Sequence, residues 1–174
     1  MTLQPFAPPA PPGTPIATVI YAPVTQQNYN PGTAMSVIDG TNLTIAFTVP
    51  ASGKFYIDVG IDWGLFPASA AFQFTSDLFL GIALHGSAGA TLLAPIQSVG
   101  GLSAPNSVAN QPGIGGHAFH RFYSSGNTPG PLQADLVMGI SSLFEITGQF
   151  YAGPGNQAVT ADPVAPVKIQ AFAA

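Results

Sequence analysis

Apolar residues alternate with small or polar residues from Leu43 to Trp63, which is the clearest strand signal in the chain. The odd-numbered positions are apolar in both runs of this segment, LTIAFTV at 43–49 and FYIDVGIDW at 55–63. A period of two is typical of a strand with one buried face. Between the runs, Pro50-Ala51-Ser52-Gly53 holds a proline and a glycine that can take positive φ, so the chain reverses here as a hairpin or turns a corner between sheets. We predict that the odd-numbered side chains face the core.

Further short apolar runs follow the same pattern along the chain. They lie at 16–21, 78–84, 91–99, 119–123, 136–140, 144–150 and 167–173. Pro95 inside one run indicates an edge strand or a bulge, and the glycine-rich segment 100–116 is expected to be a loop. The segment 68–74 suits either a helical turn or a strand. About eight to ten short strands with regular turn signals and almost no helix predict an all-β fold, an antiparallel β-sandwich that is jelly-roll-like.

The first fifteen residues are rich in proline and differ in composition from the rest of the chain. Their prolines are Pro5, Pro8, Pro9, Pro11, Pro12 and Pro15. This composition favours extended polyproline II. Two interpretations remain open: a disordered tail, or an extended strap that lies on a neighbouring subunit. We predict a Pro-rich arm at 1–15 and one β-sandwich domain at 16–174.

The composition narrows the class of protein. Of the 174 residues, 6% are charged, against about 25% in ordinary soluble domains, while 47% are hydrophobic and the mean hydropathy is +0.35. So few charges leave large uncharged surfaces, which favours a component of an assembly. Three basic residues and a net charge of −4 exclude the basic patch that nucleic-acid binding needs.

Other features of the sequence set further expectations. Glycine and proline interrupt every apolar run before the roughly 20 residues that a membrane-spanning helix needs, so no membrane partner is expected. The N-terminal residues have no basic residue and no long apolar stretch, so no secretory signal is expected. The absence of cysteine excludes disulfides and thiolate sites.

Few side chains suggest a catalytic or metal-binding site. His117 and His120 would lie on opposite faces of a strand, which makes them poor partners for a metal ion, and we expect the histidines to form local hydrogen bonds. Asp58 and Asp62 share a face roughly 13 Å apart by strand rise, too far for an acid and base pair, and we interpret them as solubilising outward carboxylates. No catalytic, cofactor or metal site is predicted, so we expect no enzyme. Cross-strand or intersubunit pairs are expected between Glu145 and Arg121, or between Asp135 and Lys168.

The segment LTIAFTVPASGKFYIDVGIDW resembles a pattern in structural proteins of tailed bacteriophages. In that pattern a strand ends in a V-P-x-S-G turn and an alternating strand follows; the matching residues here are Val49, Pro50, Ser52 and Gly53. A weaker similarity lies in EITGQFY at 145–151 and VKIQAF at 167–172, which resemble the last strands of those jelly-roll modules. The resemblance covers the β domain and not the arm.

The resemblance implies a small β-sandwich on the virion, often trimeric. A capsid decoration protein fits one short module with an arm, and it would bind the major capsid protein or other virion subunits on the outer capsid surface after synthesis in the host cytoplasm. The alternative is a minor tail or receptor-binding, lectin-like module. We expect the subunit contacts on the arm and on the outward residues of the central segment. The interface candidates are Pro5, Pro8, Pro9, Pro11, Pro12, Tyr56, Asp58, Asp62 and Arg121.

Overall fold

The computed structural model describes residues 13–24, 27–67, 74–86, 91–104, 114–141, 146–152 and 166–174. Within these ranges the chain forms strands and no helix, and so these ranges contain no helix long and apolar enough to cross a membrane. The strands are β1 (Ala17–Tyr21), β2 (Gln27–Tyr29), β3 (Ser36–Val37), β4 (Thr44–Val49), β5 (Phe55–Pro67), β6 (Phe74–Gly86), β7 (Thr91–Ala104), β8 (Ile114–Ser124), β9 (Gly130–Ile140), β10 (Ile146–Ala152) and β11 (Val167–Ala173).

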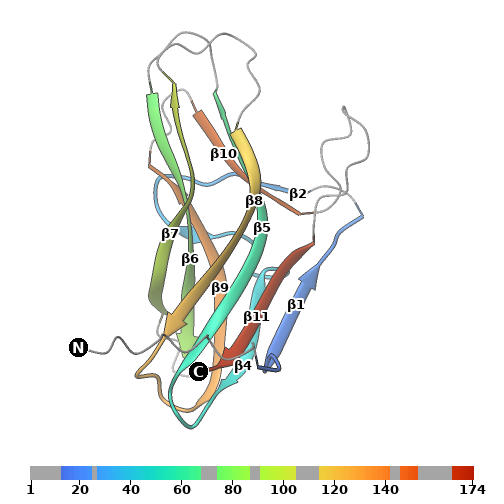
Figure 1. The fold of residues 1–174 in the computed structure, drawn as a ribbon, viewed down its shortest axis with the longest axis vertical. Helices are drawn as coiled ribbons and strands as arrows, with labels where there is room; N and C mark the ends of the chain where they lie inside the picture. Colours follow the sequence, from blue (N-terminus) through green and yellow to red (C-terminus); the bar gives the residue numbers. More distant parts are fainter. Residues whose placement is uncertain are drawn as a thin grey trace, which may run out of the picture.

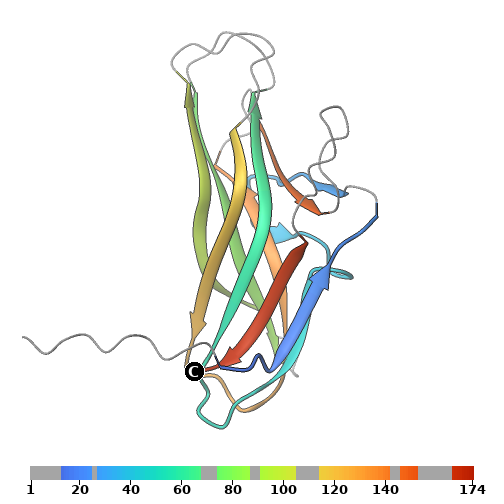
Figure 2. The ribbon, with the colours of Figure 1, turned by 45° about the vertical axis from the view of Figure 1, so that its right-hand side comes forward.

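Two antiparallel sheets pack face to face (Figures 1 and 2). In the first sheet, β8 and β11 flank β5, and β1 lies at the edge beside β11; β10 and β2 continue this edge along the far half of β5. In the second sheet, β9 lies between β6 and the short strands β3 and β4, and β7 forms the opposite edge. Among these strands only β6 and β7 are sequence neighbours that pair with each other. Strand orders β1-β11-β5-β8 and β4-β9-β6-β7 are those of a jelly roll, which confirms the predicted fold class.

The segment that the sequence suggested as a hairpin is a corner between the sheets. β4 pairs with β9 in the second sheet, whereas β5 belongs to the first, so the hairpin interpretation is wrong and the corner interpretation is confirmed. Gly53 has φ of 65° and donates its N–H to the carbonyl of Pro50 at 2.9 Å. The backbone N–H of Asn127, in the neighbouring β8–β9 connection, donates to the Gly53 carbonyl at 3.1 Å. The tight corner therefore depends on a left-handed glycine.

The core lies between the two sheets and contains the side chains that the alternation predicted. The odd-numbered residues of β4 and β5 from Ile45 to Ile61 are buried, and Phe47 and Phe55 pack edge to face with ring centroids 4.9 Å apart. The second sheet contributes the even-numbered residues of β6 and β9. These are Leu78, Leu80, Ile82, Leu84, Ala134, Leu136, Met138 and Ile140. The prediction of which side chains face the core is confirmed in both sheets.

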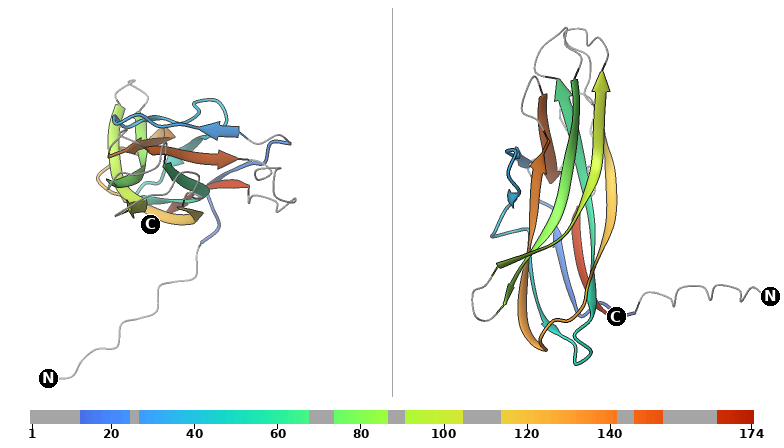
Figure 3. Two further views of the ribbon diagram at one scale, coloured as in Figure 1. Left: turned by 90° about the horizontal axis from the view of Figure 1, so that it is seen from above. Right: turned by 90° about the vertical axis from the view of Figure 1, so that its left-hand side faces the viewer.

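Several strands are longer than the predicted runs and extend along much of the molecule (Figure 3, right). β7 reaches Ala104 and β8 begins at Ile114, so both ends of the glycine-rich segment expected to be a loop are strand; residues 105–113 lie outside the described chain. Of the segment 68–74, only Phe74 is described, and it is in β6. Pro95 lies on the edge strand β7, opposite a register shift between Gly81 and Ala83, so both alternatives proposed for it are correct.

Candidate functional site

The solvent-facing side of β1, β11, β5 and β8, here called the outer face, carries rows of side chains that cross the sheet. The strand register aligns Ile20, Lys168, Gly60 and Phe119 in one row. The next row holds Thr18, Gln170, Asp58 and Arg121. Phe172, Tyr56 and Tyr123 form a third row beyond it. Segments distant in sequence thus build one continuous surface.

An ion pair with two hydrogen bonds lies at the middle of this face. The Nε and Nη2 atoms of Arg121 on β8 donate to the two carboxylate oxygens of Asp58 on β5, at 2.6 and 2.7 Å. Asp58 is only 6% exposed. Hydrogen bonding to Asp58 raises the pKa of Arg121 above its already high ordinary value. The guanidinium of Arg121 therefore stays charged, and its two-point contact with Asp58 links β8 to β5.

Aromatic rings surround the guanidinium. The Arg121 Cζ atom lies 4.1 Å from the centroid of the Tyr56 ring, in cation–π geometry. Tyr56 stacks on Phe172 at 4.8 Å and contacts Tyr123 at 5.6 Å between centroids. These contacts bury Tyr56, whereas Tyr123 is 61% exposed.

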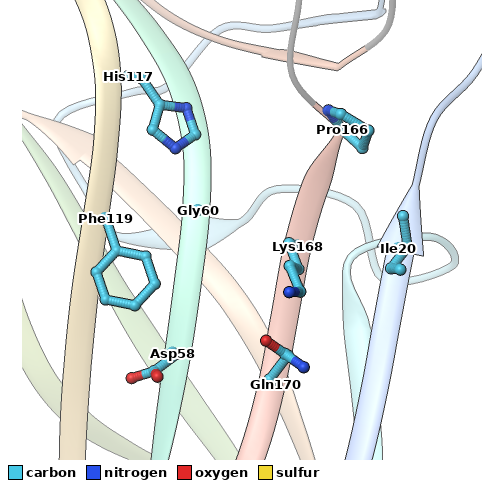
Figure 4. A pocket seen from close by; sticks show the side chains of 8 residues that line it. All are labelled: Ile20, Asp58, Gly60, His117, Phe119, Pro166, Lys168 and Gln170. Carbon is cyan, nitrogen blue, oxygen red and sulfur yellow. The ribbon is translucent and has the colours of Figure 1, made fainter.

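A hollow of about 470 Å³ opens beside the ion pair and is here called the Gly60 hollow (Figure 4). Its lining residues are Ile20, Asp58, Gly60, His117, Phe119, Pro166, Lys168 and Gln170. Gly60 has no side chain, so it leaves room between Phe119 on β8 and Lys168 on β11 (Figure 4). Phe119 and Ile20 are each 63% exposed. The hollow therefore has apolar walls and a glycine floor.

Polar groups around the hollow bond to one another. Asp58 is paired with Arg121, the Nδ1 atom of His117 lies 2.8 Å from a carboxylate oxygen of Asp62, and Gln170 donates to the hydroxyl of Thr18 at 3.3 Å. The exposed apolar walls of the hollow suit the binding of a mainly apolar group.

The structure brings four of the predicted interface candidates together on the outer face: Tyr56, Asp58, Asp62 and Arg121. The interpretation of Asp58 as a solubilising outward carboxylate is wrong, because its partner on β8 covers it. The other candidates, Pro5, Pro8, Pro9, Pro11 and Pro12, lie outside the described residues.

Of the charge pairs expected within one subunit, Asp135 with Lys168 is wrong, whereas Glu145 with Arg121 stays a prediction because Glu145 is not among the described residues. Arg121 bonds to Asp58, while a carboxylate oxygen of Asp135 in the second sheet lies 2.7 Å from the Nε2 atom of His85. Lys168 is in the other sheet, and Glu145 lies outside the described chain. Pairing depends on strand register, which the single-strand pattern does not contain.

Sequence reasoning missed Phe119, Ile20, Lys168 and Gln170 as site residues. Alternation in VKIQAF marks Lys168 and Gln170 as outward positions, whereas the largely apolar run IATVIY does not mark Ile20. Their alignment with Gly60 and Phe119 follows only from the pairing of four strands. The sequence could thus indicate which way a side chain points, but not which side chains lie together in a site.

His117 forms a hydrogen bond to Asp62 on the neighbouring strand, and His85 lies within ion-pair distance of Asp135 on its neighbouring strand. His85 and the hydroxyl of Thr44 both contact Asp135, the latter at 2.6 Å. His117 is exposed on the outer face, whereas His120 is half-buried and burial lowers its pKa. The two lie on opposite faces of β8, as predicted. Within the described ranges, no three His, Cys, Asp or Glu side chains form a group that could hold a metal ion.

Comparison with known proteins gives distant similarities only. No protein-family model and no curated protein matches the sequence. Among solved structures, a protein of infectious bursal disease virus strain Gt is 15% identical, with 100% of this chain and 42% of that chain covered and a TM-score of 0.36. The protein of the VP2 subviral particle of the same virus is 14% identical, with 99% of this chain and 41% of that chain covered and a TM-score of 0.35. The chain thus spans about two fifths of these virus proteins.

A carbohydrate-binding module is similar to the same low degree. The CBM22-1 xylan-binding domain of Paenibacillus barcinonensis Xyn10C is 10% identical, with 95% of this chain and 99% of that domain covered and a TM-score of 0.37. The similarities reach both viral capsid jelly rolls and carbohydrate-binding β-sandwiches, and neither carries an argument about function.

Proposed function

We propose that this protein is a non-enzymatic virion structural protein, a capsid decoration protein that binds the outer capsid surface of a tailed bacteriophage as a homotrimer. The observation that carries the proposal is the outer face, where Ile20, Phe119 and Tyr123 are each more than 60% exposed around the ion pair of Asp58 and Arg121. Exposed aliphatic and aromatic side chains in one patch are typical of protein–protein interfaces.

The residue types on the outer face support a protein partner. Phenylalanine, tyrosine and arginine are enriched in interfaces, and a central aromatic cluster is typical of the residues that contribute most to binding. Arg121 and Tyr56 are already ordered by Asp58 and Phe172, so little side-chain entropy is lost when a partner docks. The face is therefore preorganised for association.

The bacteriophage assignment depends on the sequence resemblance at the corner between β4 and β5. Val49, Pro50, Ser52 and Gly53 build that corner, and the jelly-roll order agrees with the type of module that the resemblance implies. The proposed partners are the major capsid protein or other virion subunits, with synthesis in the host cytoplasm and a final place on the virion.

A minor tail or receptor-binding, lectin-like module is the second candidate. It is favoured by the exposed ring of Phe119 beside Lys168 and Gln170, because an aromatic face near polar groups can stack on a sugar. Against it, the polar groups around the hollow are largely bonded to one another, and Trp63 is half-buried against the core.

The test is to locate the protein on a particle. Phage particles that carry the protein are imaged by electron microscopy, and the purified protein is added back to particles that lack it. Density on the capsid lattice supports the proposal, density on the tail supports the second candidate, and density at neither place contradicts both. Light scattering checks the trimer, and a stable monomer at micromolar concentration contradicts that part.

A further inference from the structure

We infer that the Gly60 hollow receives the Pro-rich segment of residues 1–12 from a neighbouring copy of this chain. The inference rests on the proposed function, because it names the contact between copies in the assembly. It also gives a ligand to a site that is open in the single subunit.

The hollow selects an uncharged, ring-sized apolar group. Its walls are the exposed side chains of Phe119 and Ile20, and its floor is Gly60. Asp58 and His117, which also line it, bond to Arg121 and Asp62. A ligand that addressed Asp58 or His117 would therefore have to break existing bonds, whereas an apolar ring would cover surface that is now in water while the exposed Lys168 keeps its ammonium group in water.

Residues 1–12 have the matching chemistry. The sequence MTLQPFAPPAPP contains five prolines and one phenylalanine and no charged side chain. Proline-rich segments that take the polyproline II conformation dock in grooves lined by aromatic side chains, since little conformational entropy is lost on binding. A ring-rich segment without charged side chains thus matches a hollow with exposed apolar walls.

Among the described residues, the solvent-facing side of the second sheet offers less exposed apolar surface. Met35 lies against Gly139 on that face, so that a Cβ atom at Gly139 would be 2.8 Å from the Met35 sulfur. Val137, which points to the same side of β9, is buried. The first sheet is therefore the better docking surface.

The direction of the chain favours a neighbouring copy over the same subunit. Ile16 donates to the Ala171 carbonyl at 2.8 Å and continues the course of β1. From Ile16, the Gly60 hollow lies about 13 Å further along β1, whereas the preceding residues leave the strand the other way. Pro11, Pro12 and Pro15 favour extended backbone for themselves and their predecessors. Twelve extended residues span about 37 Å, so the segment is long enough to extend beyond its own subunit.

Cysteine cross-linking on the full-length protein tests the inference, because the chain has no cysteine of its own. Two chains of different mass, one with Ala7→Cys and one with Ile20→Cys, are co-expressed, purified as the assembly and oxidised. Docking raises the local thiol concentration, so we expect on the order of tenfold more covalent heterodimer than in the control. The matched control pairs Ala7→Cys with Val37→Cys, an exposed position in the second sheet.

A variant whose side chain fills the hollow distinguishes docking of the segment in the hollow from mere proximity of the two chains. Adding Gly60→Leu to the Ile20→Cys chain should reduce the heterodimer to the control level, with an unchanged β-sheet circular dichroism spectrum as the check on folding. Equal cross-linking at Ile20 and Val37 overturns the inference, and so does cross-linking that survives in the folded Gly60→Leu variant. If a single chain carrying Ala7→Cys and Ile20→Cys cross-links only within itself, the neighbouring copy is refuted.

The outcomes separate the two proposals. Protein that decorates particles without the Ala7–Ile20 cross-link refutes this inference and leaves the proposed function standing. A cross-linked oligomer that binds no particle supports the inference and contradicts the proposed function.

Discussion

Arg121 and Asp58 form a two-point ion pair across β8 and β5, with the guanidinium held at 2.6 and 2.7 Å from the carboxylate. The carboxylate is nearly buried, whereas about a third of the Arg121 side chain is exposed. Breaking a buried pair from one side leaves an uncompensated charge, which costs more than the pair itself contributes. The outer face is thus held by a contact that requires both partners.

We expect Arg121→Met to lower the free energy of unfolding by about 2 to 4 kcal/mol, because Asp58 loses its partner in a buried place. Arg121→Lys should recover only part of the loss, since an ammonium group cannot form the two parallel hydrogen bonds. Urea denaturation measures both. The double variant Arg121→Met with Asp58→Asn should be more stable than Arg121→Met alone.

The control for this prediction is the more exposed pair of His117 and Asp62 on the same two strands. His117→Gln should change stability by less than about 1 kcal/mol, as is usual for exposed ion pairs. Equal losses at the two pairs would contradict the importance of burial.

Gly53 and Gly126 provide a matched pair at the corner. Both have positive φ, 65° and 74°, but a Cβ atom at Gly53 would lie 2.5 Å from the Asn127 carbonyl oxygen, whereas one at Gly126 meets nothing within 4 Å. Gly126→Ala should cost about 1 to 2 kcal/mol from the left-handed backbone alone. Gly53→Ala should cost clearly more, because the adjoining backbone must also move. Thermal and urea unfolding measure the difference, and equal costs would show that the contact with Asn127 relaxes freely.

Phe47 tests which side of β4 faces the core. It packs edge to face on Phe55 between the sheets. Phe47→Asp places an unpaired carboxylate there and should prevent folding, as seen by circular dichroism and solubility. Phe47→Ala should cost about 3 to 5 kcal/mol. The control Thr48→Ala, on the exposed side of β4, should stay within about 0.5 kcal/mol; cooperative folding of Phe47→Asp would show that this side chain is not essential to the core.

The sequence predicted the core better than the site because the two depend on different information. The odd-numbered residues at 43–49 and 55–61 are buried as expected, since alternation is a property of each strand alone. The pairing of Asp58 with Arg121, and the row from Ile20 to Phe119, depend on which strands are neighbours and in what register. Those relationships join residues far apart in the chain, 63 positions in the case of Asp58 and Arg121, and the pattern within one strand does not contain them.

The same distinction explains the corner. Proline and glycine in Pro50-Ala51-Ser52-Gly53 indicate a change of direction, and a hairpin and a corner use the same residue types. β4 pairs with β9 and β5 with β8 and β11. Only these distant partners decide between the two.

Asp39 provides a pH-dependent test of the turn that leads into β4. Although burial raises the pKa of its carboxyl, hydrogen bonds from Asn42, Thr41 and Tyr29 outweigh burial and lower the pKa below its ordinary value. The folded state then binds fewer protons than the unfolded state near pH 4, so stability rises with pH there. The contribution is complete above the unfolded pKa of about 3.9 and is lost as the pH falls through the lower folded value.

We therefore expect Asp39→Asn to be less stable than the wild type at pH 6 by about 1 kcal/mol, from the weaker hydrogen bonds of an uncharged acceptor. The two free energies of unfolding should converge as the pH falls below 4, because the wild-type carboxyl becomes neutral as well. Urea denaturation between pH 6 and about 3 measures this difference. Asn42→Ala keeps the carboxylate but removes one donor at 2.9 Å, so its pH dependence should lie between the two. A constant difference between wild type and Asp39→Asn at every pH would mean that the charge of Asp39 does not stabilise the turn.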